Sequence, residues 1–261
     1  MIGITIKGGL CNQLFMLFAG ISNSIDKSVD FYIYPTLIAK NYFNNIFKSI
    51  NNKINNPKEK IYKYNELNFH YEKLPENKEM LIEGFFQSDK YFKHNYEKIL
   101  EILNIKEQKE IIKKKYNIEK SIAIHFRIGD YYGLQYNHPI LPITYYINAL
   151  NYLKEKINLK EYKLLIFCQK CDNYIVEKYI ENLKYNFIKI NDDIEDYEQL
   201  FIMTMCDHNI IANSTFSWFG AYLNENKEKI IIYPSVWFGH ALQNNNIDDL
   251  CPIEWKKINI L

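Results

Sequence analysis

The chain has 261 residues, 48% of them hydrophobic, which is enough to bury the cores of one large or two small domains. Its 32 basic and 31 acidic side chains give a formal net charge of +1, which excludes a general electrostatic attraction to nucleic acid or to an anionic membrane. An anionic ligand must therefore be bound by local groups.

Targeting signals and cysteines restrict the class further. The opening apolar run is too short for a signal peptide, and no stretch of about 18 apolar residues is present, so we expect a cytoplasmic protein without a transmembrane segment. The five cysteines are odd in number and widely spread, which favours reduced thiols. Cys168 and Cys171 have zinc-pair or redox spacing, but the second pair that a zinc site needs is absent from the sequence.

Apolar, β-branched runs alternate along the chain with segments of helical periodicity, which is typical of parallel βαβ units. We therefore predict an α/β fold. The expected strands are Ile2–Ile6, Val29–Tyr34, Ser121–Phe126, Lys163–Phe167, Asn186–Ile190, His208–Ala212 and Lys229–Tyr233.

Helix signals are clearest in the second half. Pro142 suits a first helical position, and Asp172, Asp196 and Ser214 stand where N-caps are expected. Residues 97–120 are predicted to form one charged amphipathic helix, with the lysines at 113–115 as its solvated end. A domain boundary near residue 118 follows, which gives domains 1–118 and 119–261.

Ligands of open α/β sheets bind beyond the carboxyl ends of the strands, so the residues after each strand carry the functional signal. After the first strand, Gly8 and Gly9 permit close backbone approach, and Asn12 and Gln13 open an apolar helix. The G-x-G-x-x-G spacing of a dinucleotide site is missing. A glycine turn with a capping Asn and a ligand-binding turn both remain open.

A second strand end carries His125, Arg127 and Asp130 around a glycine. A guanidinium at this place can bind a phosphate with two hydrogen bonds and keeps its charge at all relevant pH values. The alternative is a structural Arg–Asp ion pair. His125 alternates with its apolar neighbours and projects from the opposite face of the strand, where a core role is also open.

The third strand end turns through Asn213, Ser214, Thr215 and Ser217 into an apolar helix. Free backbone N–H groups at a helix start, supplemented by hydroxyls, form an anion-binding cradle, although an ordinary N-cap explains the same residues. Together with Arg127, this cradle predicts a pyrophosphate site that needs no metal.

A metal-dependent transferase requires an acidic pair at a strand end, and Asp192–Asp196 is the one candidate segment. We interpret it as a solvated loop, so no metal ligands and no cofactor are expected. Sequence signatures of serine hydrolases, zinc proteases and P-loop kinases are absent.

Several segments, in order along most of the chain, resemble the α-1,2-fucosyltransferases of glycosyltransferase family 11. The sequence GGLCNQLF at residues 8–15 is similar to the family's GGLGNQLF. GFFQSDKYF at 84–92, HFRIGDY at 125–131 and the 209–223 run resemble the family's GYFQSEKYF, HxRRGDY and NSTFSWWGAWL. Tyr197–Leu200 with Met203, and Trp237-Phe238, match two further motifs.

This resemblance implies a GT-B architecture, two Rossmann-like domains facing a cleft, with the nucleotide sugar on the C-terminal half. It implies a metal-independent, inverting transfer of L-fucose from GDP-fucose to the 2-hydroxyl of a galactose-type residue on an oligosaccharide. The implied donor-site residues are His125, Arg127, Asn213, Ser214, Thr215, Ser217 and Glu198. Arg127 and Asp130 take catalytic roles, and Asn12 and Gln13 reach in from the acceptor side.

Two positions depart from the family motifs. Cys11 replaces a glycine and Ile128 replaces the second arginine. The loss of one cation leaves two alternatives open: a related enzyme that uses another GDP-hexose, and an inactive sugar- or nucleotide-binding protein of the same fold. The catalytic base that receives the acceptor proton is undecided between Asp130, Glu198 and another residue.

Overall fold

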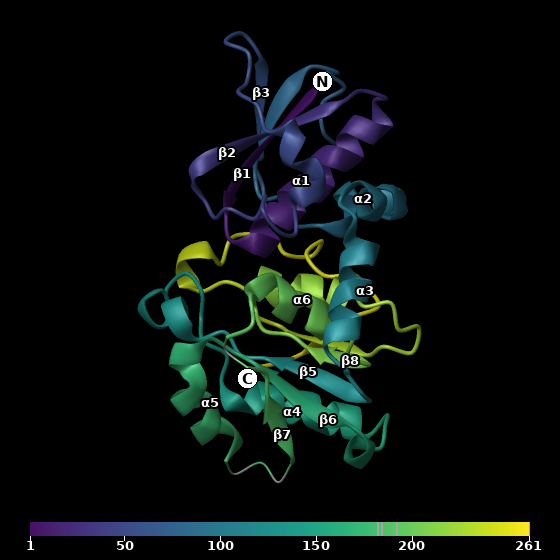
Figure 1. The fold of residues 1–261 in the computed structure, drawn as a ribbon. Coiled ribbons are helices and arrows are strands. Elements are labelled where there is room, and N and C mark those ends of the chain that lie inside the picture. Colours follow the sequence, from purple (N-terminus) through teal and green to yellow (C-terminus); the bar gives the residue numbers. More distant parts are fainter. Residues whose placement is uncertain (182, 184, 192, 261) are drawn as a thin grey trace. The chain divides into compact units, whose positions relative to one another are not determined.

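A computed structural model describes residues 1–181, 183, 185–191 and 193–260 and separates them into two compact units (Figure 1). Unit 1 comprises Met1–Glu110 and Asn245–Pro252, and unit 2 comprises Ile111–Asn244 and Ile253–Leu261. Each unit contains one sheet, and every strand pair in both sheets is parallel. The predicted α/β class is therefore confirmed. That residues 1–118 and 119–261 fold as separate domains stays a prediction.

Unit 1 has a four-stranded sheet in the order β2-β1-β4-β3. Its strands are β1 (Ile2–Gly8), β2 (Phe31–Ala39), β3 (Tyr62–Asn65) and β4 (Met80–Glu83). Its helices are α1 (Leu10–Asp26), α2 (Tyr96–Ile102) and the short 3-10 turns η1 (Lys48–Lys53), η2 (Asp89–Tyr91) and η3 (Lys93–Asn95). Helix α1 packs closely on β1: a Cβ at Gly20 would lie 2.4 Å from Cγ1 of Ile4.

Unit 2 has a six-stranded sheet in the order β10-β9-β8-β5-β6-β7. Its strands are β5 (Ser121–His125), β6 (Lys163–Phe167), β7 (Phe187–Lys189), β8 (His208–Ile210), β9 (Ile231–Pro234) and β10 (Lys256–Ile258). Its helices are α4 (Ile143–Lys154), α5 (Asn173–Ile180), α6 (Asp196–Thr204) and α7 (Thr215–Tyr222), with 3-10 turns η4 (Gly129–Gly133), η5 (Leu159–Glu161), η6 (Lys170–Asp172) and η7 (His240–Leu242). Helix α3 (Ile105–Lys115) precedes β5.

The core of unit 2 follows the period of two that a sheet imposes. Ile122 and Ile124 of β5, with their counterparts on β6, β8 and β9, form one buried cluster with the apolar face of α4. Figure 1 shows α4 and α6 on opposite sides of these strands. Elsewhere in the unit, the buried ring of Trp218 stacks on Tyr222 at 4.6 Å and lies 5.4 Å from the ring of Trp255.

All seven predicted strands are present, with ends that differ by a few residues. Three further strands, β3, β4 and β10, were missed. Two of these are edge strands with largely exposed residues, and β4 has only four residues, so neither alternation nor length marked them.

Three helix predictions need correction. The single helix expected over 97–120 is two helices, α2 and α3, because the chain turns at Asn104, whose φ is 53°. Asp196 is the first residue of α6 and Glu195 takes the N-cap position. Pro142 lies one residue earlier than expected, as the N-cap of α4. The lysines at 113–115 do form an exposed helix end, as predicted.

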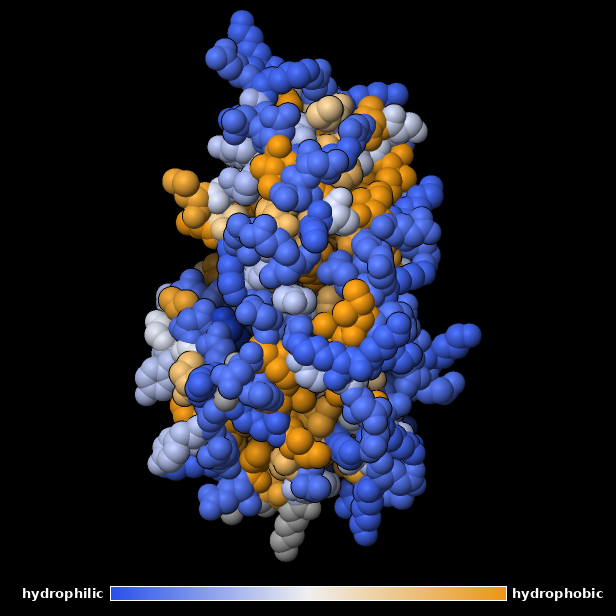
Figure 2. Space-filling model, viewed as in Figure 1, coloured by the Kyte–Doolittle hydropathy of each residue, from blue (hydrophilic) through white to orange (hydrophobic). Residues whose placement is uncertain are grey.

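Figure 2 shows a face on which hydrophilic residues predominate, with smaller apolar patches between them. Within the described part of the chain, no helix combines the length and the apolar character needed to cross a membrane.

Candidate functional site

The connection order in unit 2 marks a ligand-binding edge. From β5 the chain adds β6 and then β7 on one side, and it then returns to add β8 on the other side of β5. In open parallel sheets such a switch point leaves a crevice beyond the strand ends, where ligands bind. Arg127 follows β5 and Ser214 follows β8, so the fold brings the second and third predicted strand ends to this switch point.

Two contacts join the loops at the switch point. The hydroxyl of Tyr131 donates a hydrogen bond to the carbonyl oxygen of Asn213 at 3.1 Å. The imidazole of His125 lies 5.6 Å from the ring of Phe216, the second residue of α7. The loop that carries Arg127 is therefore adjacent to the start of α7.

Arg127 is held on two sides. Its Nη2 lies 2.6 Å from Oδ1 of Asp130, and its guanidinium carbon lies 5.0 Å from the ring centroid of Tyr131. Its side chain keeps 22% of its surface exposed. A guanidinium has five N–H donors, so donors remain for an anionic ligand. The ion pair and the ligand-binding role, which were alternatives in the sequence, are compatible in this geometry.

His125 is a buried histidine with an incomplete set of partners. Its Nδ1 has no hydrogen-bond partner among the described residues, and the residue is only 6% exposed. Burial, reinforced by the positive charge of Arg127, lowers the pKa of His125 to about 3. The imidazole is therefore neutral at pH 7 and can donate or accept a hydrogen bond according to its tautomer.

The start of α7 has the capping geometry that the sequence predicted. The hydroxyl of Ser214 accepts a hydrogen bond from the N–H of Phe216 at 3.3 Å, and Thr215 is the first helical residue. The hydroxyl of Ser217 is fully buried and accepts from the N–H of Ala212 at 3.2 Å. Ser217 thus stabilises the turn, and its contact with a ligand stays a prediction.

Asn213 shapes this turn. Its Nδ2 donates to the carbonyl oxygens of Pro139 and Trp237 at 2.9 and 3.2 Å. Its Oδ1 is buried and has no partner among the described residues. This side chain therefore places a second incompletely paired polar atom at the switch point.

Glu198 has different surroundings. Its carboxylate accepts from Lys115 Nζ at 2.8 and 2.9 Å and from the hydroxyl of Tyr116 at 2.8 Å. These contacts join the start of α6 to the end of α3. The donor contact predicted for Glu198 stays a prediction.

Asn12 and Gln13 lie at the corresponding place in unit 1, where β1 is flanked by β2 and β4. Nε2 of Gln13 donates to the carbonyl oxygens of Gly8 and Lys40 at 2.7 and 2.8 Å, which joins the ends of β1 and β2. Oδ1 of Asn12 accepts from Nε2 of Gln87 at 3.3 Å, which joins α1 to the segment after β4. Gln87, which carried no predicted role, completes this amide cluster.

The sequence comparison decides the family. A model of "Glycosyl transferase family 11" matches residues 5–259. The chain belongs to glycosyl transferase family 11. An alpha-1,2-colitosyltransferase of Escherichia coli is 31% identical over 191 residues, which are 67% of this chain and 61% of that protein. The O-antigen biosynthesis glycosyltransferase WbnK of Escherichia coli is 32% identical over 141 residues, 51% of this chain and 43% of WbnK. The matched region thus spans about two fifths to three fifths of the relatives' length.

Solved structures with low sequence identity share the fold. The Escherichia coli ADP-heptose lps heptosyltransferase II matches with a TM-score of 0.52 at 10% identity, and the match covers all of this chain and 90% of that one. The fucosyltransferase NodZ from Bradyrhizobium matches with a TM-score of 0.50 at 11% identity, covering 84% of this chain and 91% of NodZ. The predicted GT-B type, with two Rossmann-like halves, is confirmed as the fold of this family 11 chain.

The position of the missing second arginine has a clear structural role. Ile128 is only 3% exposed and belongs to the core cluster of unit 2. The chain therefore uses this position as a hydrophobic anchor for the loop, and Arg127 is its remaining cation.

Two residues near Arg127 were not assigned to the site from the sequence. Both oxygens of Asp172, which was predicted only as an N-cap, accept from the N–H of Gly129 at 2.8 and 2.9 Å. The ring of His138 stacks on Tyr131 at 5.0 Å, and burial lowers the pKa of His138. Applying the strand-end rule to Lys163–Phe167 would have drawn attention to Asp172, which follows that strand.

Metal ligands are not gathered in the described part of the family 11 chain: no three His, Cys, Asp or Glu side chains there are placed to hold an ion. Asp192 of the acidic segment lies outside the described residues. Neither Cys168 nor Cys171 forms a disulfide with another described cysteine. Metal independence stays a prediction.

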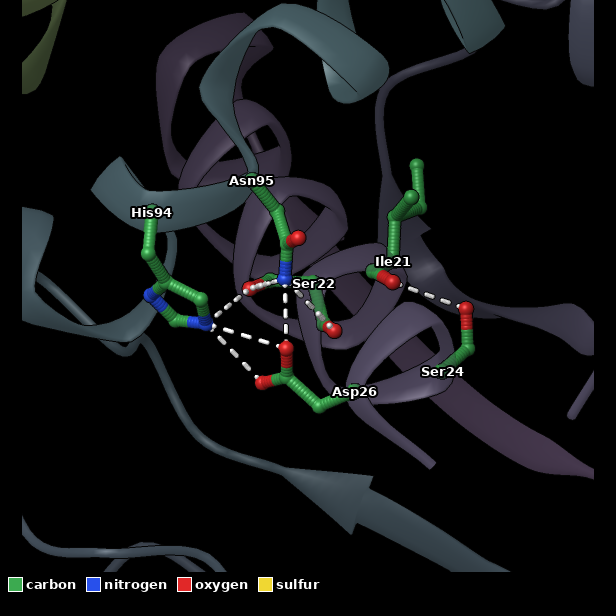
Figure 3. A network of polar contacts seen from close by, with 6 residues as sticks. All are labelled: Ile21, Ser22, Ser24, Asp26, His94 and Asn95. Atoms are coloured by element: carbon green, nitrogen blue, oxygen red, sulfur yellow. Dashed lines mark hydrogen bonds and ion pairs between the residues drawn. The ribbon is translucent and has the colours of Figure 1, made fainter. Parts of the chain in front are cut away.

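Unit 1 contains a serine, a histidine and an aspartate in contact, which is the composition of a hydrolase triad (Figure 3). Nε2 of His94 lies 2.9 Å from Oδ2 of Asp26 and 3.4 Å from Oγ of Ser22, so one nitrogen meets both partners. In a triad, separate ring nitrogens contact the acid and the nucleophile. Ser22 is also fully buried and accepts a hydrogen bond from Asn95 at 3.0 Å. The network is a structural clamp on the end of α1.

Proposed function

We propose that this family 11 protein is an inverting glycosyltransferase that transfers L-fucose from GDP-β-L-fucose to the 2-hydroxyl of a galactose-type residue on an oligosaccharide. The observation that carries the proposal is the placement of Arg127 at the switch point of unit 2, beside the start of α7. Family membership and the alpha-1,2-linkage named for the colitosyltransferase relative support it.

The amino-acid composition strengthens the role of Arg127. It is the only arginine in the sequence, and the other 31 basic residues are lysines. Lysine supplies charge equally well at an exposed site, but only arginine offers a planar, bidentate donor that matches phosphate geometry. The chain thus uses lysine for 31 of its 32 basic residues and places its one arginine at this strand end.

The proposed chemistry places negative charge next to this guanidinium. As the sugar becomes oxocarbenium-like, the bond to the β-phosphate breaks and charge accumulates on the departing GDP. Arg127 stabilises that charge, and the start of α7, with its positive dipole end and the hydroxyls of Ser214 and Thr215, binds the phosphates. The neutral His125 and the free Oδ1 of Asn213 supply further hydrogen bonds to the nucleotide sugar.

The catalytic base is proposed to be Asp130. Its side chain is 57% exposed and its carboxylate pairs with Arg127, so an acceptor hydroxyl can approach it. Glu198 is the poorer candidate, because its side chain is only 10% exposed and its carboxylate accepts from both a lysine and a tyrosine. The proton of the acceptor hydroxyl moves to the base as the new glycosidic bond forms.

A second candidate donor is GDP-colitose, which is favoured by the 31% identity to an alpha-1,2-colitosyltransferase. Colitose is the 3-deoxy form of L-fucose. A site that hydrogen-bonds the 3-hydroxyl rejects the deoxy sugar strongly, whereas an apolar site accepts it. The two donors are therefore separable by kinetics. A requirement for neither metal nor cofactor, and a cytoplasmic location, belong to the same proposal.

The test is a donor panel with the purified protein: GDP-fucose, GDP-colitose, GDP-mannose and two UDP-sugars, with product linkage determined by NMR. We expect turnover with GDP-fucose and an α-1,2 product. Preference for GDP-colitose would select the second candidate. Binding of GDP-fucose without turnover on any galactoside would indicate an inactive binding protein, and binding of UDP-sugars alone would reject both donors.

Because the chain has a single arginine, the proposed role of Arg127 can be tested by chemical modification. An arginine-selective dicarbonyl reagent can modify only Arg127 in this chain. We expect modification to abolish transfer and GDP to protect against it, while UDP does not. Modification that leaves transfer intact would reject the role of Arg127.

A further inference from the structure

Asp172 is a buried carboxylate between two loops of unit 2. It ends the turn η6 that follows β6, and it is 3% exposed. Its position corresponds to the N-cap of α5, but its side chain makes no capping hydrogen bond there. Both of its oxygens instead accept from the N–H of Gly129, in the loop that follows the neighbouring strand β5.

The two loops lie close together at Gly129. A Cβ there would lie 2.0 Å from Oε1 of Gln169, a distance that no side chain tolerates without moving its neighbour. Because Oε1 is the far end of a flexible, exposed side chain, a substitution at residue 129 would displace the side chain of Gln169 rather than the backbone. On the other side, Ile128 is anchored in the core.

These contacts fix the backbone between the two proposed functional side chains. Arg127 precedes Ile128, Asp130 follows Gly129, and the ion pair between Arg127 and Asp130 spans them at 2.6 Å. A charged acceptor forms a stronger hydrogen bond than a neutral one, so the Asp172–Gly129 contact holds the loop firmly. With one guanidinium available, the orientation of the phosphate depends on this loop.

We propose that Asp172 is a positioning residue, which fixes the Arg127–Asp130 loop for binding the diphosphate of a nucleotide by accepting the N–H of Gly129. The inference rests on the proposed role of Arg127. Asp172 touches no reacting atom in this scheme. It acts by limiting the movement of the loop, and a displacement of about 1 Å in a binding group can lower a rate by up to about 10²-fold.

The first experiment compares Asp172→Ala and Asp172→Asn with the matched control Asp193→Ala. Asp193 is a nearby aspartate with an 81% exposed side chain, 3.7 Å from Lys170. Titration with GDP gives the affinity, and ¹⁵N-arginine labelling gives one guanidinium signal, because the chain has one arginine. Circular dichroism confirms that each variant is folded.

We expect Asp172→Ala to shift the Arg127 signal and to weaken GDP binding by roughly 10-fold to 10²-fold. Asp172→Asn keeps one acceptor oxygen and should recover part of the loss, whereas Asp193→Ala should match the unmodified protein. A folded Asp172→Ala protein with an unchanged Arg127 signal and normal GDP affinity overturns the proposal. If that variant does not fold, the same two measurements on Asp172→Asn decide, and unchanged values there overturn it.

The second experiment separates positioning from general stabilisation. Residues that act as one unit show non-additive effects. If Asp172 works through Arg127, then Asp172→Ala should cause little further loss of kcat/KM in an Arg127→Ala background. Fully additive losses would show a purely structural role. Should Arg127→Ala alone leave GDP binding intact, the proposed function fails; should it abolish binding while Asp172→Ala has no effect, only the inference about Asp172 fails.

Discussion

In both units the first strand lies between the second and the fourth strand of the unit, and yet the two switch points carry different side chains. In unit 1, β1 is flanked by β2 and β4, and in unit 2, β5 is flanked by β6 and β8. The unit 1 edge carries the side-chain amides of Asn12, Gln13 and Gln87. The unit 2 edge carries a guanidinium, a neutral imidazole and a helix start with a hydroxyl cap.

We propose that this difference lets one architecture support two kinds of recognition. Cations and free N–H groups match phosphate, whereas neutral amides match hydroxyl groups without a charge. The backbone topology supplies the crevice, and the residues after each strand select the ligand. On this basis unit 2 is the proposed nucleotide-sugar side and unit 1 the proposed acceptor side.

The largest expected effect comes from removing the charge that distinguishes unit 2. Arg127→Ala should lower kcat/KM by on the order of 10²-fold or more, as loss of a preorganised charge stabiliser does. Steady-state kinetics with the best donor of the panel measures this effect. Gln13→Leu in unit 1 is the comparison: it removes no charge and should affect donor KM far less. Equal losses of donor affinity from both changes would contradict the division of roles.

The loss of folding stability at acid pH should arise in unit 2, through His125. His125 is neutral in the folded chain with a pKa of about 3, whereas the unfolded chain has an ordinary pKa of about 6.5. Below about pH 6.5 the unfolded state binds a proton that the folded state does not. The contribution of neutral His125 to the free energy of unfolding is therefore complete above pH 6.5 and is lost as the pH falls.

At pH 5 the cost from His125 is up to about 2 kcal/mol. Denaturant unfolding at pH 7 and pH 5 measures it, and His125→Gln should lose less stability between these two pH values than the unmodified protein. An identical loss in both proteins would show that His125 is not the titrating group.

Replacing a closely packed helix glycine by alanine should cost more stability in unit 1 than in unit 2. A Cβ at Gly20 meets the stiff, β-branched Ile4, so Gly20→Ala should cost about 1–3 kcal/mol of stability. A Cβ at Gly220 would lie 2.2 Å from Sδ of Met203, whose flexible side chain can move aside, so Gly220→Ala should cost less. Gly133→Ala, with no atom within 4 Å of its Cβ, is the matched control. Thermal unfolding ranks the three, and a larger loss at Gly220 would reverse the reasoning.

For removal of divalent metal ions we expect no change in turnover. If phosphate charge in unit 2 is neutralised by Arg127 and α7, chelation with EDTA should leave turnover unchanged. Activity lost with EDTA and restored by Mn²⁺ would instead assign a metal role to the acidic segment that begins at Asp192.

The sequence predicted five of the six strands of unit 2 and their ends, because apolar β-branched runs and the residues after them are local signals. It did not find β3, in which Tyr62 and Tyr64 alternate with exposed polar residues at a sheet edge. It gave Asp172 a capping role, because its true partner is a backbone N–H brought close by the pairing of β5 and β6. A contact between a side chain and a backbone group far away in the chain has no characteristic residue spacing by which the sequence would reveal it.

The distribution of one residue type separates the units in spectroscopy. All three tryptophans, Trp218, Trp237 and Trp255, lie in unit 2, and unit 1 contains none. Fluorescence excited at a wavelength that only indole absorbs therefore reports on unit 2 alone. Compared with far-ultraviolet signals from both sheets, it reveals whether the two units unfold in one step or in two.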